Sequence, residues 1–225
     1  MSFILVGLAF ILAVIDWLAV AFRWKKIEYL AKPGVIVALI AWLTVNGGYQ
    51  GQLLFFIIGL GFSMAGDIAL MLPKGSFLAG LVFFLIAHVF FILGFNVTIP
   101  QFSFAGLVIL ILIGINAVEI SRRIIKGCVA QGKDFLRIPV LIYTLVISIM
   151  VFSELLTLVR PNIEWVPLAS LFVSLGAILF FISDTLLSWN KFVTPFKNAD
   201  LSVIITYHIA QITIILGAGI NFLTR

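Results

Sequence analysis

Two aspartates with similar surroundings are the residues of this sequence best suited to chemistry. Asp67 stands in the stretch GDIALMLPK and Asp184 in the stretch SDTLLSWNK. In each stretch a small residue precedes the aspartate, and a short apolar run leads to a lysine. The apolar segment that follows carries a histidine, His88 in one case and His208 in the other. This pattern predicts an internal repeat with the functional site where its two copies meet. Chance similarity between apolar segments is the alternative.

Ionisable groups in apolar segments are expensive to keep there. A carboxylate near the centre of a bilayer costs about 2.5–3.5 kcal/mol, so such groups usually face a cavity, a substrate path or a proton path. Two carboxyls can also work as a pair, in which an apolar site favours the protonated form of one while the other stays ionised. The residues alone are equally compatible with an enzyme and with a proton-coupled transporter. A structural protein would tolerate replacement of both aspartates.

Other polar side chains in apolar segments are candidates for binding. Tyr207, His208 and Gln211 form a hydrogen-bonding group within about one helical turn. A lone buried histidine more often bonds a backbone carbonyl, so His208 is a candidate only as part of this group. Tyr143 and Asn116 are further candidates, for which a structural role is the stronger expectation.

The elements that must position these groups are membrane-spanning helices. The chain has 225 residues, 63% of them hydrophobic and 10% charged, whereas soluble domains carry about 25% charged residues. A spanning helix needs about 20 mostly apolar residues, so eight of them use nearly the whole chain. We predict an all-α fold, a polytopic eight-transmembrane-helix bundle that forms a single domain over residues 1–225. The predicted spans are 3–22, 33–45, 52–72, 77–95, 102–120, 136–158, 165–189 and 201–223.

Basic residues are distributed very unevenly between the two ends of this predicted bundle. All but two of the 14 Lys and Arg residues fall at one end, and the exceptions are Arg160 and Arg225. By the positive-inside rule that end is cytoplasmic, and both termini are non-cytoplasmic. The net charge of +5 is then a matter of topology and lipid headgroups, and we expect no nucleic-acid partner. The compact chain favours a bacterial inner (plasma) membrane.

Helix packing and charge pairing lead to further expectations. Gly59, Ser63 and Asp67 are spaced by four residues, which predicts a small-residue face packed against another helix. Asp16 and Glu119 lie beside basic segments and are expected to reach water and pair with Lys or Arg. For Glu154 a surface role and a functional role are equally compatible with the sequence.

Several of these stretches resemble the lysoplasmalogenase family of integral membrane hydrolases, the YhhN-like proteins. The resemblance covers roughly residues 59–217, and its most specific part is the GD element followed by the SD…NKF element. The matching stretches are GDIALML at Asp67, GLVFFLIAHVFFILGF with His88, PVLIYTLVISIM with Tyr143, GAILFFISDTLLSWNKF with Asp184, and YHIAQ with Tyr207 and Gln211.

This resemblance implies eight transmembrane helices and hydrolysis of the vinyl ether bond of lysoplasmalogens. The products would be a fatty aldehyde and glycerophosphoethanolamine or glycerophosphocholine. The implied partners are a lysophospholipid substrate and membrane lipids, and neither a metal nor an organic cofactor is expected.

The implied chemistry suits a pair of carboxyl groups. Protonation of the vinyl β-carbon creates an oxocarbenium ion, water adds to the α-carbon, and the hemiacetal collapses. Glycoside hydrolysis uses two carboxyls around a similar cation. We therefore expect Asp67 and Asp184 to be the catalytic pair. The residues expected to orient substrate or water are His88, Tyr143, Tyr207 and Gln211. Lys74 and Lys191 are candidates to meet the substrate phosphate, although helix-end anchoring is the stronger expectation for both.

Overall fold

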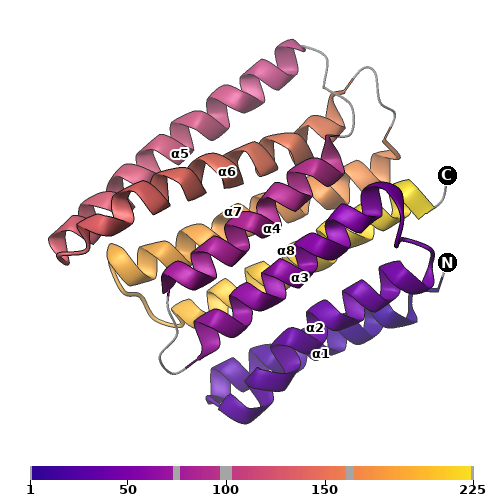
Figure 1. Cartoon of the computed structure of the whole chain (residues 1–225), viewed down its shortest axis with the longest axis horizontal. Coiled ribbons are helices and arrows are strands. Elements are labelled where there is room, and N and C mark those ends of the chain that lie inside the picture. The colour runs from indigo at the N-terminus through magenta and orange to yellow at the C-terminus, as the bar shows by residue number, and fades with distance from the viewer. Residues whose placement is uncertain (1, 73–76, 97–102, 161–164, 224–225) are drawn as a thin grey trace.

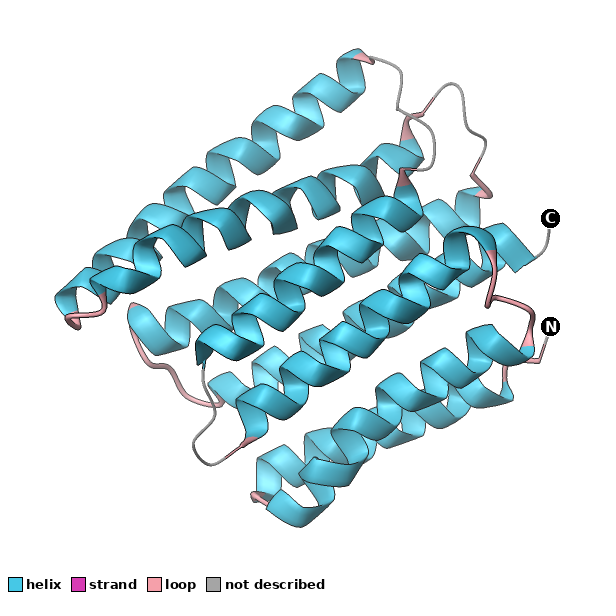
Figure 2. Ribbon diagram, viewed as in Figure 1, coloured by secondary structure: helices cyan, strands magenta, loops and turns pink. Residues whose placement is uncertain are grey.

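The apolar segments form helices because lipid offers no hydrogen-bond partner to an unpaired backbone group. The computed structural model describes residues 2–72, 77–96, 103–160 and 165–223. Within these ranges the regular structure is entirely helical (Figure 2). Each of its eight α-helical segments is long and apolar enough to cross a membrane, which confirms the predicted fold class. The helices are α1 Ile4–Phe22, α2 Lys25–Val45, α3 Gly51–Met71, α4 Phe77–Phe95, α5 Phe104–Ala130, α6 Arg137–Leu155, α7 Pro167–Phe192 and α8 Ala199–Leu223, with single 3-10 turns at Asp134–Leu136 and Leu156–Leu158.

Two helices extend well beyond the predicted apolar spans. Helix α2 begins at Lys25 rather than at Pro33, and α5 continues to Ala130 rather than ending at Ile120. Both extensions are rich in Lys and Arg, whose long side chains can reach headgroups and water while the backbone stays helical. Hydropathy therefore located the membrane-buried part of each helix and missed its basic end.

Three helical hairpins make up most of the bundle. The most extensive packing joins α7 to α8, α3 to α4 and α1 to α2. Helix α8 is the most buried, because it also packs against α1, α2 and α3. Helix α5 is the least buried and lies at one edge, with α1 and α2 at the opposite edge (Figure 1). Since α4 and α7 both pack against α6, side chains from several hairpins can meet between them.

Glycines allow the α3–α4 and α7–α8 hairpins to close tightly. A Cβ atom on Gly66 would lie 2.8 Å from the ring of Phe84, and one on Gly176 would lie 2.5 Å from Ile214. The predicted small-residue face of α3 is buried along its length, as expected. Close approach of this kind is the usual basis of helix association in lipid.

Both ends of the chain lie at the same end of the bundle (Figure 1). This arrangement follows from an even number of antiparallel spans. Which side of the membrane that end faces remains a prediction from the distribution of Lys and Arg.

Candidate active site

Three helices bring polar side chains together around Asp184. The Tyr143 hydroxyl on α6 donates a hydrogen bond to Asp184 Oδ2 near the end of α7. His88 Nε2 on α4 lies 2.9 Å from the Tyr143 oxygen and 3.5 Å from Asp184 Oδ2. The His88 side chain is fully buried, and the Asp184 side chain keeps 15% of its surface exposed. A carboxyl, a phenol and an imidazole thus share one contact region.

This cluster can hold its protons in two arrangements, because a phenol has a single proton. When Tyr143 donates to an ionised Asp184, His88 Nε2–H can donate to the Tyr143 oxygen. When Asp184 is protonated and donates to Tyr143, the tyrosine can donate to an unprotonated Nε2. A proton can therefore move between carboxyl and imidazole without leaving the cluster.

A second polar contact surrounds Asp67. Asp67 is buried on α3, and its Oδ2 accepts a hydrogen bond of 2.8 Å from the Tyr207 hydroxyl on α8. The Tyr207 ring meets Phe84 and Phe180 edge to face, with centroids 5.8 and 5.5 Å away. These rings hold the tyrosine in place, so the carboxyl has a fixed partner.

One aromatic side chain, Phe180, contacts residues of both aspartate sites. Phe180, which packs on Tyr207, also meets His88 edge to face at 4.9 Å. Each hairpin also contributes a side chain that contacts the aspartate of the other hairpin. His88 of the α3–α4 hairpin lies close to Asp184, and Tyr207 of the α7–α8 hairpin donates a hydrogen bond to Asp67.

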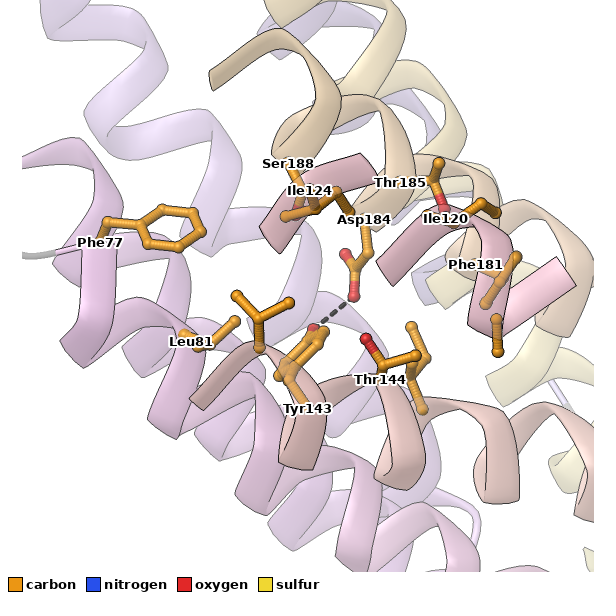
Figure 3. A pocket seen from close by; sticks show the side chains of 13 residues that line it. Phe77, Leu81, Ile120, Ile124, Tyr143, Thr144, Phe181, Asp184, Thr185 and Ser188 are labelled. Carbon is orange, nitrogen blue, oxygen red and sulfur yellow. Dashed lines mark hydrogen bonds between the residues drawn. The ribbon is translucent and has the colours of Figure 1, made fainter. Parts of the chain in front are cut away.

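An apolar cavity opens beside Asp184 (Figure 3). It is narrow, with a volume of about 30 Å³, and lies between α4, α5, α6 and α7. Figure 3 shows Asp184 and Tyr143 pointing toward one another at its wall. Most of the lining is hydrocarbon, and the remaining hydroxyls belong to Thr144, Thr185 and Ser188. The cavity therefore combines one acid group with largely apolar walls.

A smaller cavity extends from this site toward α3. Its volume is about 10 Å³, and Tyr143 and Asp184 line it together with Leu70 and Phe84. Because Phe84 packs on Tyr207, Asp67 lies about one side-chain layer behind the cavity wall. The two carboxyls occupy neighbouring sites, of which the Asp184 site is the more open.

The remaining residues predicted to bind substrate are Gln211, Lys191 and Lys74, which do not share one location. Gln211 is buried on α8, one turn after Tyr207. Lys191 Nζ stands 5.1 Å from the centroid of Phe77, whose ring lines the Asp184 cavity. Lys74 lies outside the described residues.

The expectation for Asp16 is wrong. Its side chain is fully buried, and His208 Nε2 lies 3.9 Å from its Oδ2. The cause is a row of small residues: Ala9, Ala13 and Ala19 are buried with Asp16 on one face of α1. That spacing was the signal in the sequence, and it outweighs the basic segment that follows.

The other carboxyls lie away from the Asp184 cavity. Glu119 is exposed and pairs with Arg123 at 2.7 Å, which confirms the expected surface pair. Glu154 is fully buried, and its carboxyl oxygens have no hydrogen-bond partner in the described part of the chain. Asn116 donates a hydrogen bond of 2.8 Å to the Leu112 carbonyl of its own helix. No three His, Cys, Asp or Glu side chains of the described ranges gather as a metal site would require.

Comparisons of the sequence with known proteins identify relatives that are named lysoplasmalogenases. The chain is 29% identical to lysoplasmalogenase TMEM86B of Sus scrofa over 185 residues, which cover 82% of this chain and 70% of that protein. It is 29% identical to lysoplasmalogenase TMEM86A of Homo sapiens over 72% of this chain and 63% of the relative. A lysoplasmalogenase homolog of Dictyostelium discoideum is 30% identical over 67% of this chain and 54% of its own length. No solved structure matches significantly. The sequence model of the YhhN family matches residues 27–218, and the chain therefore belongs to the YhhN family.

Proposed function

We propose that this protein is a lysoplasmalogenase, which hydrolyses the vinyl ether bond of lysoplasmalogens to a fatty aldehyde and a glycerophosphoethanolamine or glycerophosphocholine. The observation that carries the proposal is the Asp184 carboxyl, hydrogen-bonded to Tyr143 at the wall of an apolar cavity. The names of the relatives support the same reaction.

Asp184 is the acid in this proposal, because it borders the cavity while Asp67 lies behind its wall. The protonated Asp184 gives its proton to the β-carbon, and the π electrons of the double bond form the new C–H bond. The ether oxygen shares its lone pair with the α-carbon, so an oxocarbenium ion faces the new carboxylate.

Water completes the reaction. It adds to the α-carbon and gives one proton to the Asp184 carboxylate, which restores the acid. The hemiacetal hydroxyl then loses its proton, the bond to the glycerol oxygen breaks, and that oxygen takes up a proton. The reaction consumes one water without net proton uptake. The contacts of Asp184 with Tyr143 and His88 allow it to alternate between acid and base within the site.

Asp67 acts on the cation electrostatically in this scheme. Its carboxyl, held by the Tyr207 hydroxyl, lies across the aromatic layer from the Asp184 site and stabilises the developing positive charge. The substrate phosphate lies at the end of the cavity where Lys191 covers Phe77.

Conservative substitutions of the two carboxyls test the proposal. Asp184→Asn and Asp67→Asn keep the size of the side chain and remove its acid function. We expect each to lower aldehyde release from lysoplasmalogen at least about 100-fold in purified, detergent-solubilised protein, the lower range for a general acid. The matched control is Asp134→Asn, because Asp134 is an exposed residue paired with Arg137. Near-normal turnover in a well-folded Asp184→Asn protein contradicts the mechanism.

The same assay distinguishes an enzyme from a proton-coupled transporter. None of the relatives reported above is named as a transporter. An enzyme releases aldehyde in detergent, where no proton gradient exists. A 1-acyl lysophospholipid of equal chain length serves as the substrate control, because it lacks the vinyl ether.

A further inference from the structure

A long apolar groove continues from the Asp184 cavity. It has a volume of about 380 Å³ and lies between α5, α6 and α7. Its lining is hydrocarbon apart from Asn116 and Thr185. Ile120, Phe181 and Thr185 line both spaces, so the groove begins beside Asp184.

The direction of the groove follows from the helices that form it. It reaches Leu112 on α5 and Ile178 on α7, each about two turns before the shared residues Ile120 and Thr185. At 1.5 Å rise per residue this is about 10 Å toward the opposite end of the bundle. Leu112 and Ile178 are both largely exposed in the isolated bundle, so this part of the groove faces lipid.

We propose that this groove, lined by α5 and α7 over Val151 and Leu155 of α6, binds the hydrocarbon chain of the substrate and sets chain-length preference. The inference rests on the proposed function. A chain that enters from the lipid side between α5 and α7 has its first carbons beside Asp184 and its tail beside Ile178. Loose packing provides the space, since α5 contacts α7 less extensively than it contacts α6.

A second space on the other side of α5 is the competing path. It lies between α5 and α6, has a volume of about 300 Å³, and is lined by Ile149 among others. It shares Ala117 and Thr144 with the Asp184 cavity but no residue of α7. The α5–α7 groove is favoured because Thr185, next to Asp184 in the chain, forms part of its wall.

Two matched substitutions distinguish these paths. Ile178→Trp narrows the α5–α7 groove, and Ile149→Trp narrows the other space; both side chains are partly exposed to lipid, at 47% and 42%. We assay aldehyde release from two lysoplasmalogens, one with a chain that ends before Ile178 and one with a chain that extends past it. Ile178→Trp should lower kcat/KM for the long chain at least about tenfold and leave the short chain unaffected. Ile149→Trp should affect neither.

Each other outcome has a definite meaning. A long-chain loss confined to Ile149→Trp overturns the proposal and places the chain between α5 and α6. An unchanged chain profile in both variants also overturns it. If Ile178→Trp does not fold, Leu112→Trp blocks the same groove from α5. Absence of aldehyde from the wild-type protein with either substrate is instead a failure of the proposed function.

Discussion

At the scale of single residues, Tyr143 is the side chain that links the polar groups of the Asp184 site. It donates to Asp184 and lies 2.9 Å from His88 Nε2, so it connects the carboxyl to the imidazole. Asp184 itself approaches His88 less closely, at 3.5 Å. If protons move through this cluster, the phenol hydroxyl is the group that carries them.

Removal of this hydroxyl should therefore affect turnover far more than folding. We expect Tyr143→Phe to lower kcat about 100-fold, because the ring remains while the proton path is lost. Tyr29→Phe is the control, since the Tyr29 hydroxyl is exposed and donates to the Met71 carbonyl at 3.1 Å. Equal kcat in Tyr143→Phe and wild type would show that the hydroxyl takes no part in catalysis.

The buried pair of Asp16 and His208 is a second feature of residue scale. Asp16 precedes the segment that matches the YhhN family, which starts at residue 27. Its carboxyl oxygens find no hydrogen-bond donor within the described ranges, and His208 Nε2 is 3.9 Å away. Two ionisable groups that are excluded from water should depend on one another energetically.

A double-mutant cycle measures this dependence. Asp16→Ala and His208→Ala should each lower the free energy of unfolding, because each leaves a buried polar group without its neighbour. The double variant should lose less than the sum of the two, with a coupling of about 0.5–1.5 kcal/mol. Unfolding of the purified protein in detergent gives these values, and strict additivity would mean that the two side chains do not interact.

At the scale of helices, the α7–α8 hairpin determines where Asp184 stands. A Cβ atom on Gly176 would lie 2.5 Å from Ile214 and 2.9 Å from the Ala210 carbonyl oxygen, which is backbone and cannot rotate away. Gly61 of α3, by contrast, has no atom within 4 Å of the corresponding position. The close contact between α7 and α8 therefore requires a glycine at position 176, whereas position 61 has room for a larger side chain.

The two glycines predict opposite effects of the same substitution. Gly176→Ala should lower stability by about 1–3 kcal/mol, because α7 and α8 must separate. It should also lower aldehyde release, since Asp184 moves with α7. Gly61→Ala should leave stability unchanged or raise it by up to about 1 kcal/mol through helix propensity. Thermal unfolding of both variants tests the comparison, and a stable Gly176→Ala protein would contradict it.

At the scale of the whole molecule, the distribution of charge predicts orientation in the membrane. The end of the bundle that carries the Asp184 cavity and Lys191 also carries most of the Lys and Arg residues. The positive-inside rule places this end in the cytoplasm. Substrate would then be cleaved near the cytoplasmic leaflet.

Cysteine labelling tests the orientation. Cys128 is the only cysteine of the chain, so a Cys128→Ser background is free of thiols. Tyr49→Cys and Lys197→Cys place single thiols at exposed positions on opposite ends. An impermeant thiol reagent should label Tyr49→Cys in intact cells and Lys197→Cys only after permeabilisation. The reverse pattern would invert the topology.

The sequence by itself determined the class of fold and the identity of the aspartates worth testing. A chain with 63% hydrophobic residues must bury its backbone polar groups in helices, and that requirement is local to each segment. The four-residue spacing of small side chains up to Asp67 likewise predicted a packed helix face, since helical periodicity is also a local property. The basic ends of α2 and α5 were missed, because hydropathy does not distinguish a basic helical turn from a loop.

Only the tertiary structure decided which side chains meet. Tyr207 binds Asp67 across 140 residues of sequence, and His88 meets Tyr143 across 55. No local pattern could select Asp184 as the carboxyl at the cavity or identify His208 as the neighbour of Asp16. Those contacts depend on how closely glycine lets one helix approach the next, which is a property of pairs of helices rather than of any single segment.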